Sequence, residues 1–154
     1  LWRVHQQAPQ KGYIQIFNRS HYEDVLIQRV HKWIDSDTVK RRFEHINHFE
    51  KLLESNNTIV LKFFMHVSPE KQLERLEERR TKEEEMFKYN PNDMEERKLW
   101  SDYEKAYEDV LEVCNHVPWE IVPTDNNWYK EYIIAKKCVE VMKELNMKYP
   151  TIEK

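Results

Sequence analysis

Glycine is almost absent from this sequence. Gly12 is the only one among 154 residues. The G-x-x-x-x-G-K-[ST] loop that surrounds nucleotide phosphates needs at least two glycines, because bare backbone amides must crowd around the phosphate oxygens. The chain therefore cannot contain this loop.

Cysteines, long apolar runs and a strong net charge are lacking as well. Cys114 and Cys138 have neither metal-ligand spacing nor the pattern of a disulfide framework, which favours a reducing cytoplasm. No apolar run approaches the ~18 residues of a membrane span, and no signal peptide is evident, so we expect no membrane partner. A net charge of −3 gives no indication of a nucleic-acid partner.

The remaining composition is that of a globular protein, with 40% apolar and 34% charged residues. A chain of this length suffices for one modest core, and no linker or repeat interrupts it, so we expect residues 1–154 to form a single domain. The first residue is Leu1 rather than Met, and LWRVHQQAP reads as the end of a helix that stops near Pro9. We take this start to be a truncation.

The stretch KGYIQIFNRSHYEDVLIQR, residues 11–29, organises the predicted fold. Gly12 allows a turn, and the apolar run 13–17 has the composition of a strand that we expect to be buried. Ser20, with Glu23 three residues later, has the spacing of a capping box and predicts a helix start. The polar residues of this turn should therefore lie at the carboxyl end of a strand, where open α/β sheets bind ligands.

Arg19, Glu23 and Asp24 are the candidate functional residues of that turn. Two carboxylates and a guanidinium at a helix start suit metal and phosphate chemistry. The alternative is that the acids only stabilise the helix start, an effect of about 0.3–1 kcal/mol. That alternative does not explain the arginine beside them, so we favour a functional site.

Helices and apolar strands alternate along the rest of the chain, which predicts an α/β fold with a parallel sheet and helices on both faces. One helix should bury Val39, Phe43, Ile46, Phe49, Leu52 and Leu53 on one face. The expected elements are a helix from Ser20 to about Trp33, a helix over about 35–57, a strand over 58–67, a helix from Ser68-Pro69 through Arg80, a helix from Asp93 to about Asn115, a strand WEIVP and a helix from Tyr129 to about Lys148.

Four segments in register resemble the second family of polyphosphate kinases. They are IFNRSHYEDVL after a PxKG turn and LWRVHQQ, then LKFFMHVSPEKQLERLEER, DMEERKLWSDYEKAYE and PWEIVPTDNNWY. The resemblance spans nearly the whole chain and implies a P-loop kinase-like fold similar to thymidylate kinase. It also implies an enzyme that moves phosphate between polyphosphate and nucleoside mono- or diphosphates (AMP/ADP to ADP/ATP) with Mg²⁺.

The resemblance also implies that the fold is incomplete at the N-terminus. The glycine-rich loop, its strand and a second strand are expected upstream of Leu1. Three strands of this chain would then lack their central neighbour and its backbone hydrogen bonds. We therefore expect the isolated chain to be inactive.

The family pattern assigns roles to the residues of the central turn. Glu23 and Asp24 are expected to hold or orient Mg²⁺, and Arg19 to contact a phosphate, so these three are the predicted catalytic residues. Many family members carry aspartate where this chain has Asn18, which moves the magnesium role to the next turn or upstream. The variant resembles the branch that accepts AMP as well as ADP.

Further cations are predicted to bind phosphate. Arg29 lies where many family members have an arginine. Arg3 and Lys11 border the same strand end, although either of these two could equally be an ordinary exposed cation. The charged segment of about 75–95 corresponds to the lid of P-loop kinases, with Arg75, Arg79, Arg80 and Lys88 as phosphate ligands. The alternative is a solvated hairpin between two helices.

The expected partners are polyphosphate and adenine or guanine nucleotides, in a cytoplasmic homo-oligomer. Two other functions stay open: an ATP-dependent nucleoside monophosphate kinase, and a non-catalytic fragment or interaction module. The sequence leaves undecided the nucleotide preference, the direction of net flux, the size of the oligomer and the reason for the missing glycine loop.

Overall fold

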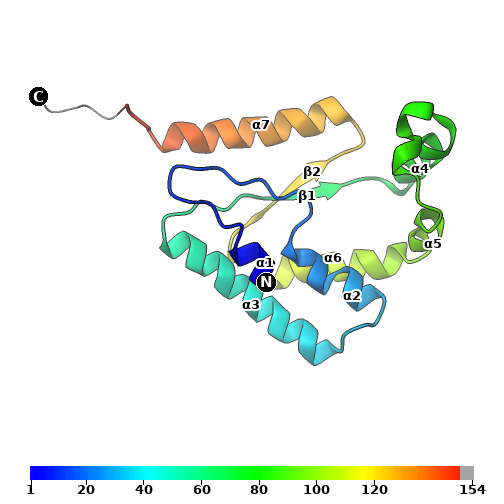
Figure 1. The fold of residues 1–154 in the computed structure, drawn as a ribbon, viewed down its shortest axis with the longest axis horizontal. Helices are drawn as coiled ribbons and strands as arrows, with labels where there is room; N and C mark the ends of the chain where they lie inside the picture. Colours follow the sequence, from blue (N-terminus) through cyan, green and yellow to red (C-terminus); the bar gives the residue numbers. More distant parts are fainter. Residues whose placement is uncertain (150–154) are drawn as a thin grey trace, which may run out of the picture. The chain divides into compact units, whose positions relative to one another are not determined.

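The computed structural model describes residues 1–149. It divides into two compact units, one made of 1–62 with 88–119 and the other of 63–87 with the residues from 120 onward. Figure 1 labels the helices and strands; η1 and η2 are 3-10 helices. The elements are α1 (Trp2–His5), η1 (His21–Val25), α2 (Ile27–Val30), α3 (Ser36–Ser55), β1 (Lys62–His66), α4 (Pro69–Thr81), η2 (Glu83–Lys88), α5 (Asp93–Arg97), α6 (Trp100–Val113), β2 (Trp119–Pro123) and α7 (Asn127–Glu144).

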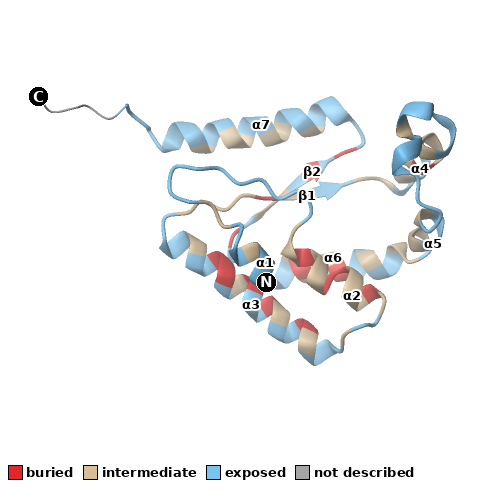
Figure 2. Cartoon of the chain, viewed as in Figure 1, coloured by how far each residue is buried: buried red, intermediate tan, exposed pale blue. Residues whose placement is uncertain are grey.

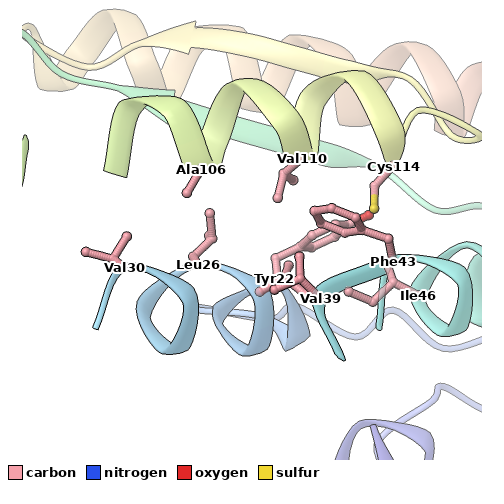
Figure 3. Packing of buried hydrophobic residues seen from close by; sticks show 10 residues of the cluster. Tyr22, Leu26, Val30, Val39, Phe43, Ile46, Ala106, Val110 and Cys114 are labelled. Carbon is pink, nitrogen blue, oxygen red and sulfur yellow. The ribbon is translucent and has the colours of Figure 1, made fainter. Parts of the chain in front are cut away.

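The core of the first unit lies between η1, α2, α3 and α6. Figure 3 shows Ala106 and Val110 of α6 pointing toward the side chains of α2 and α3. Helix α3 begins as predicted, because the Asp35 carboxylate accepts a 2.7 Å hydrogen bond from the Thr38 amide. The core members are Tyr22, Val25, Leu26, Val30, Val39, Phe43, Ile46, Ala106, Val110 and Cys114.

The buried face of α3 differs from the prediction at three positions, one of which is Leu53, which is only half-buried. Leu52 is 51% exposed, whereas Glu50 is 1% exposed. The reason is that Glu50 continues the 3.6-residue spacing of Phe43 and Ile46, while Leu52 falls beside that stripe. A buried carboxylate needs polar partners, and these are described below.

The predicted helix from Ser20 to Trp33 is replaced by two short helices. The Ser20 hydroxyl caps η1 by accepting from the Tyr22 amide at 3.4 Å. The helix then breaks at Leu26 (φ −102°, ψ −84°), and α2 ends before Lys32, which has φ +57°. The break lets Leu26 enter the core, and Trp33 is left 67% exposed.

The prediction of a buried strand at 13–17 is wrong. Ile14 and Ile16 are 72% and 81% exposed, and no strand is formed there. A strand requires a neighbour that pairs its backbone groups, and within 1–149 the single backbone bond of this segment runs from the Tyr13 amide to the Gln10 carbonyl at 3.1 Å. Strand-like composition is therefore not sufficient here.

The predicted helix from Asp93 to Asn115 is also two helices, α5 and α6. Leu99 separates them with φ −89° and ψ 14°, outside regular helix geometry. Its side chain packs against the core of the first unit. The packing of Leu99 therefore takes precedence over continuous helical hydrogen bonding.

The second unit holds most of a parallel two-stranded sheet, β1 beside β2 (Figure 1). Strand β1 is shorter than the predicted 58–67, and Met65 is 43% exposed, because β2 is its only strand neighbour in the described residues. Helix α4 starts as predicted: the Ser68 hydroxyl accepts from the Lys71 amide at 3.1 Å, with Pro69 in the first helical position.

Buried residues are unevenly distributed among the helices. Figure 2 shows them gathered on α2, α3 and α6, while α7 carries none. Trp128 and Tyr132 of α7 are 70% and 56% exposed. Among residues 1–149, no helix combines the length and apolar character needed to cross a bilayer.

Candidate functional site

Two carboxylates of η1 face solvent beside an arginine. The side chains of Glu23 and Asp24 are 45% and 43% exposed. The Arg19 guanidinium Nε lies 3.7 Å from Glu23 Oε1, and Asp24 Oδ1 accepts from the Gln28 amide nitrogen at 3.2 Å. The three residues predicted to be catalytic therefore lie on one accessible turn.

The backbone around this turn is held by two features. Arg19 has φ +64°, in the left-handed region that side-chain-bearing residues seldom adopt. From α3, Arg42 Nη1 donates to the Asp24 carbonyl and to Gln28 Oε1, each at 2.6 Å. These contacts of Arg42 fix the end of η1 and helix α2 relative to α3.

The donor set limits how this turn could hold a metal. Within the described residues, no group of three or more His, Cys, Asp or Glu side chains is arranged to hold an ion. Magnesium usually keeps several waters and takes one or two carboxylates together with substrate phosphates. Glu23 and Asp24 fit that mode and do not fit an all-protein site.

Arg29 is committed to a carboxylate of its own protein. Its Nη2 atom lies 2.5 Å from Asp109 Oδ2 on α6, and its Nη1 atom is buried without a hydrogen-bond partner. A phosphate that bound Arg29 would have to compete with Asp109. Phosphate binding by Arg29 stays a prediction.

The other predicted cations lie in separate parts of the chain, three on helices and one in a turn. Arg3 on α1 is exposed, and so is Lys11, which precedes Gly12 with its φ of +86°. Arg79 is half-buried on α4, and Lys88 is the exposed last residue of η2. Their phosphate roles stay predictions.

Arg75 fastens the loop that follows β2. Its Nη2 atom donates to the Thr124 carbonyl at 2.5 Å and to Asn127 Oδ1 at 3.2 Å. In the same unit, the Ser68 amide donates to Asp125 Oδ1 at 2.9 Å, which lowers the pKa of that carboxyl. Arg80 instead lies 3.3 Å from Glu77 on its own helix.

Sequence reasoning missed a buried polar network in the first unit. Lys62 Nζ donates to Glu50 Oε2 at 2.9 Å, to the Tyr22 hydroxyl at 2.9 Å and to the Cys114 carbonyl at 2.7 Å. The Tyr22 hydroxyl in turn donates to Glu50 Oε1. Burial and the Glu50 carboxylate raise the pKa of Tyr22 well above its ordinary value, so the phenol stays protonated.

Aromatic rings enclose this network. The Lys62 ammonium lies 4.6 Å from the centroid of the Trp119 ring, whose indole N–H donates to the Cys114 carbonyl at 2.9 Å. The signals in the sequence were Glu50 on the apolar stripe of α3 and Lys62 within the apolar run TIVLKFFMHV. Nothing in the sequence pointed to Tyr22.

His21 predicts a pH dependence of stability. Burial lowers its pKa to about 4, and neither ring nitrogen has a hydrogen-bond partner. The folded state binds this proton less readily than the unfolded state, whose histidine titrates near 6.5. The stabilising contribution is therefore complete above pH ~6.5 and is lost as the pH falls toward 4, by up to about 3 kcal/mol.

Urea denaturation of the whole protein at a series of pH values measures this loss. A His21→Phe variant keeps an aromatic ring beside Tyr22, which stacks on His21 at 4.7 Å between centroids. We expect this variant to lose less stability between pH 6.5 and 4 than the wild type. An unchanged pH profile in His21→Phe would assign the acid sensitivity to other groups.

A family model described as "Polyphosphate kinase 2 (PPK2)" matches residues 1–150. The chain belongs to this family. The AMP/ADP-polyphosphate phosphotransferase of Meiothermus ruber is 42% identical over 99% of this chain and 58% of its own length. The ADP-polyphosphate phosphotransferase of Rhodopseudomonas palustris is 37% identical over 97% of this chain and 57% of its own. The chain thus spans less than three fifths of either relative.

Solved structures agree with the family assignment. The crystal structure of Polyphosphate Kinase 2 from Arthrobacter aurescens TC1 matches with a TM-score of 0.95 and 34% identity, over 99% of this chain and 55% of that one. A putative polyphosphate kinase 2 from Pseudomonas aeruginosa shares the fold, with a TM-score of 0.83 at 24% identity over 96% of this chain and 32% of that one. These likenesses confirm the predicted P-loop kinase-like α/β fold.

Proposed function

We propose that the whole protein transfers phosphoryl groups between polyphosphate and adenine nucleotides, AMP or ADP. The observation that carries this proposal is the turn with Arg19, Glu23 and Asp24 in a chain that matches the polyphosphate kinase 2 family over residues 1–150. The relative from Meiothermus ruber, whose printed name includes both AMP and ADP, supports the choice of nucleotides.

In the proposed reaction, an oxygen of the nucleotide phosphate attacks the terminal phosphorus of polyphosphate. The bond to the bridging oxygen breaks, and a polyphosphate shorter by one phosphate leaves. Such transfers depend mainly on positioning and positive charge. The Arg19 guanidinium, which is 84% exposed, can bind a phosphate oxygen.

Glu23 and Asp24 would hold Mg²⁺, directly or through water. When bound, Mg²⁺ would neutralise charge that develops on the phosphate oxygens. The two carboxylates would orient the cation, and their negative charges would repel a phosphate that approaches without it. The 75–95 segment is proposed as the lid over the phosphates, with Arg79, Arg80 and Lys88 adding cations. Arg75 is proposed to support the loop 124–127 through its contact with the Thr124 carbonyl.

The donor decides between this proposal and an ATP-dependent nucleoside monophosphate kinase. The whole protein should form ADP from AMP, and ATP from ADP, when polyphosphate and Mg²⁺ are supplied, and nucleotides separated by chromatography measure this. The matched reaction replaces polyphosphate with ATP. Product with ATP alone as donor would contradict the proposal, and no product with either donor would favour a non-catalytic role.

The same assay compares this 154-residue chain with the whole protein. The chain carries the carboxylate turn but no glycine-rich phosphate loop, because Gly12 is its single glycine. We expect activity in the whole protein and none in the chain. The cytoplasmic location and the homo-oligomer stay predictions, and the free thiols of Cys114 and Cys138 support the first of them.

A further inference from the structure

The 3-10 geometry of η1 links Tyr22 to the orientation of the carboxylates. A 3-10 helix has three residues per turn, so consecutive side chains are separated by about 120°. Tyr22 and Val25, three residues apart, form one edge of η1 and are 4% and 0% exposed. Glu23 and Asp24 occupy the other two edges and are almost equally exposed, 45% and 43%. Whatever fixes Tyr22 therefore sets the direction of both carboxylates.

The hydroxyl of Tyr22 is fixed by directional bonds from two sides. It accepts from Lys62 Nζ at 2.9 Å and donates to the Glu50 carboxylate. Each of the three ammonium protons of Lys62 has one acceptor, and the acceptors come from η1, α3 and the end of α6. A buried network with all its members satisfied rigidifies the elements that it joins.

The network stands apart from the residues assigned to phosphate or metal. Glu50 is 1% and Lys62 is 6% exposed, so neither can reach a ligand in solvent. Stability alone does not explain the Glu50–Lys62 pair, because apolar residues of similar volume often stabilise a core as well as a buried ion pair does. A directional role at Tyr22 accounts for the polar groups.

We propose that Tyr22, Glu50 and Lys62 are positioning residues for the carboxylate turn. Through the Tyr22 hydroxyl, the Glu50–Lys62 pair holds η1 in the rotation that keeps Glu23 and Asp24 exposed on its two other edges, where a cation-bound phosphate can reach them. The part of this inference that concerns the ligand rests on the proposed function. The part that concerns the rotation of η1 is independent of it.

The substitution Tyr22→Phe tests the inference, because it removes the hydroxyl and keeps the ring. Hydrogen exchange of the whole protein measures how firmly η1 is held in place, and it does not depend on enzymatic activity. The Glu23 and Leu26 amides bond to the Ser20 and Glu23 carbonyls at 3.2 and 3.3 Å, and we expect their exchange to accelerate about tenfold. The amides of α3 should keep their wild-type rates under the same conditions.

The matched control is Val39→Ala, which removes apolar packing from the same core and leaves every hydrogen bond of the network in place. It should lower global stability without selective acceleration at Glu23 and Leu26. Selective acceleration in Tyr22→Phe supports the positioning role. Wild-type exchange at both amides would overturn it, whatever the protein's function.

The second readout is cation affinity. Loss of a residue that orients a metal ligand typically weakens metal binding or activity by about 10–100-fold. In Tyr22→Phe we expect at least about tenfold weaker binding of Mn²⁺ with polyphosphate by calorimetry, together with a higher Mg²⁺ requirement and an unchanged KM for the nucleotide. Val39→Ala should match the wild type in all three.

The two measurements distinguish failure of the proposed function from failure of the positioning inference. If the wild type binds no cation and shows no transfer, the proposed function fails, and hydrogen exchange alone decides the positioning of η1. If exchange accelerates while cation affinity stays at the wild-type value, the link between Tyr22 and the carboxylates is overturned.

Discussion

Lys62→Met is expected to lower the free energy of unfolding of the whole protein by about 3–5 kcal/mol, because it leaves the Glu50 carboxylate buried without its counter-charge. Glu50 is 1% exposed and would retain only the Tyr22 hydroxyl as a hydrogen-bond partner. Domains are typically stable by about 5–15 kcal/mol. This single substitution should therefore bring the protein close to unfolding at moderate temperature.

Urea denaturation monitored by circular dichroism measures the loss as a fall in the midpoint. The control is the double variant Glu50→Leu/Lys62→Met, which removes both charges and keeps similar volumes. Apolar replacement of a whole buried pair is often neutral, so the double variant should recover part of the lost stability. The recovery stays incomplete because the buried Tyr22 hydroxyl loses both of its partners. If the double variant is less stable than Lys62→Met, the ion pair is itself a major stabilising interaction.

Asp24→Asn and Glu23→Gln should each reduce polyphosphate-dependent transfer by at least about 100-fold, since a bound cation contributes several kcal/mol to the transition state and each 1.36 kcal/mol is a factor of ten. Both substitutions remove a charge without changing the shape of the side chain. The Asp24 oxygen that accepts from Gln28 at 3.2 Å is retained as an amide oxygen. Folding should therefore be little affected.

Initial rates over a range of Mg²⁺ concentrations measure this effect in the whole protein. Asp37→Asn is the matched control, because its carboxylate is 87% exposed at the start of α3, away from η1 in the sequence. It should keep wild-type activity. If Asp24→Asn and Glu23→Gln are as active as this control, the carboxylate turn is not the cation site.

Local signals predicted the elements that depend on local chemistry. Asp35 and Ser68 cap α3 and α4 as expected, and β2 has its predicted bounds. Helix capping is decided within four residues, so the sequence contains the information. The position of Arg19 beside Glu23 was predictable for the same reason.

The predictions that failed concern structure that depends on contacts between residues far apart in the sequence. Residues 13–17 have strand composition, but pairing depends on a neighbour elsewhere in the chain. The network of Tyr22, Glu50 and Lys62 joins positions 28 and 40 residues apart. The commitment of Arg29 to Asp109 spans 80 residues. No local pattern can specify such pairs, although a lone charge on an apolar stripe indicates that one exists.

The exposed segment 13–17 has a consequence for mutagenesis. Short apolar stretches with high β-propensity associate edge to edge unless charged neighbours act as gatekeepers. Lys11 and Arg19 stand at the two ends of this stretch, and both are exposed. A substitution that neutralises either residue removes a candidate phosphate ligand, and it also removes a charge that opposes self-association. Lost turnover in Lys11→Ala or Arg19→Ala therefore signifies lost phosphate binding only when light scattering shows that the variant has not aggregated.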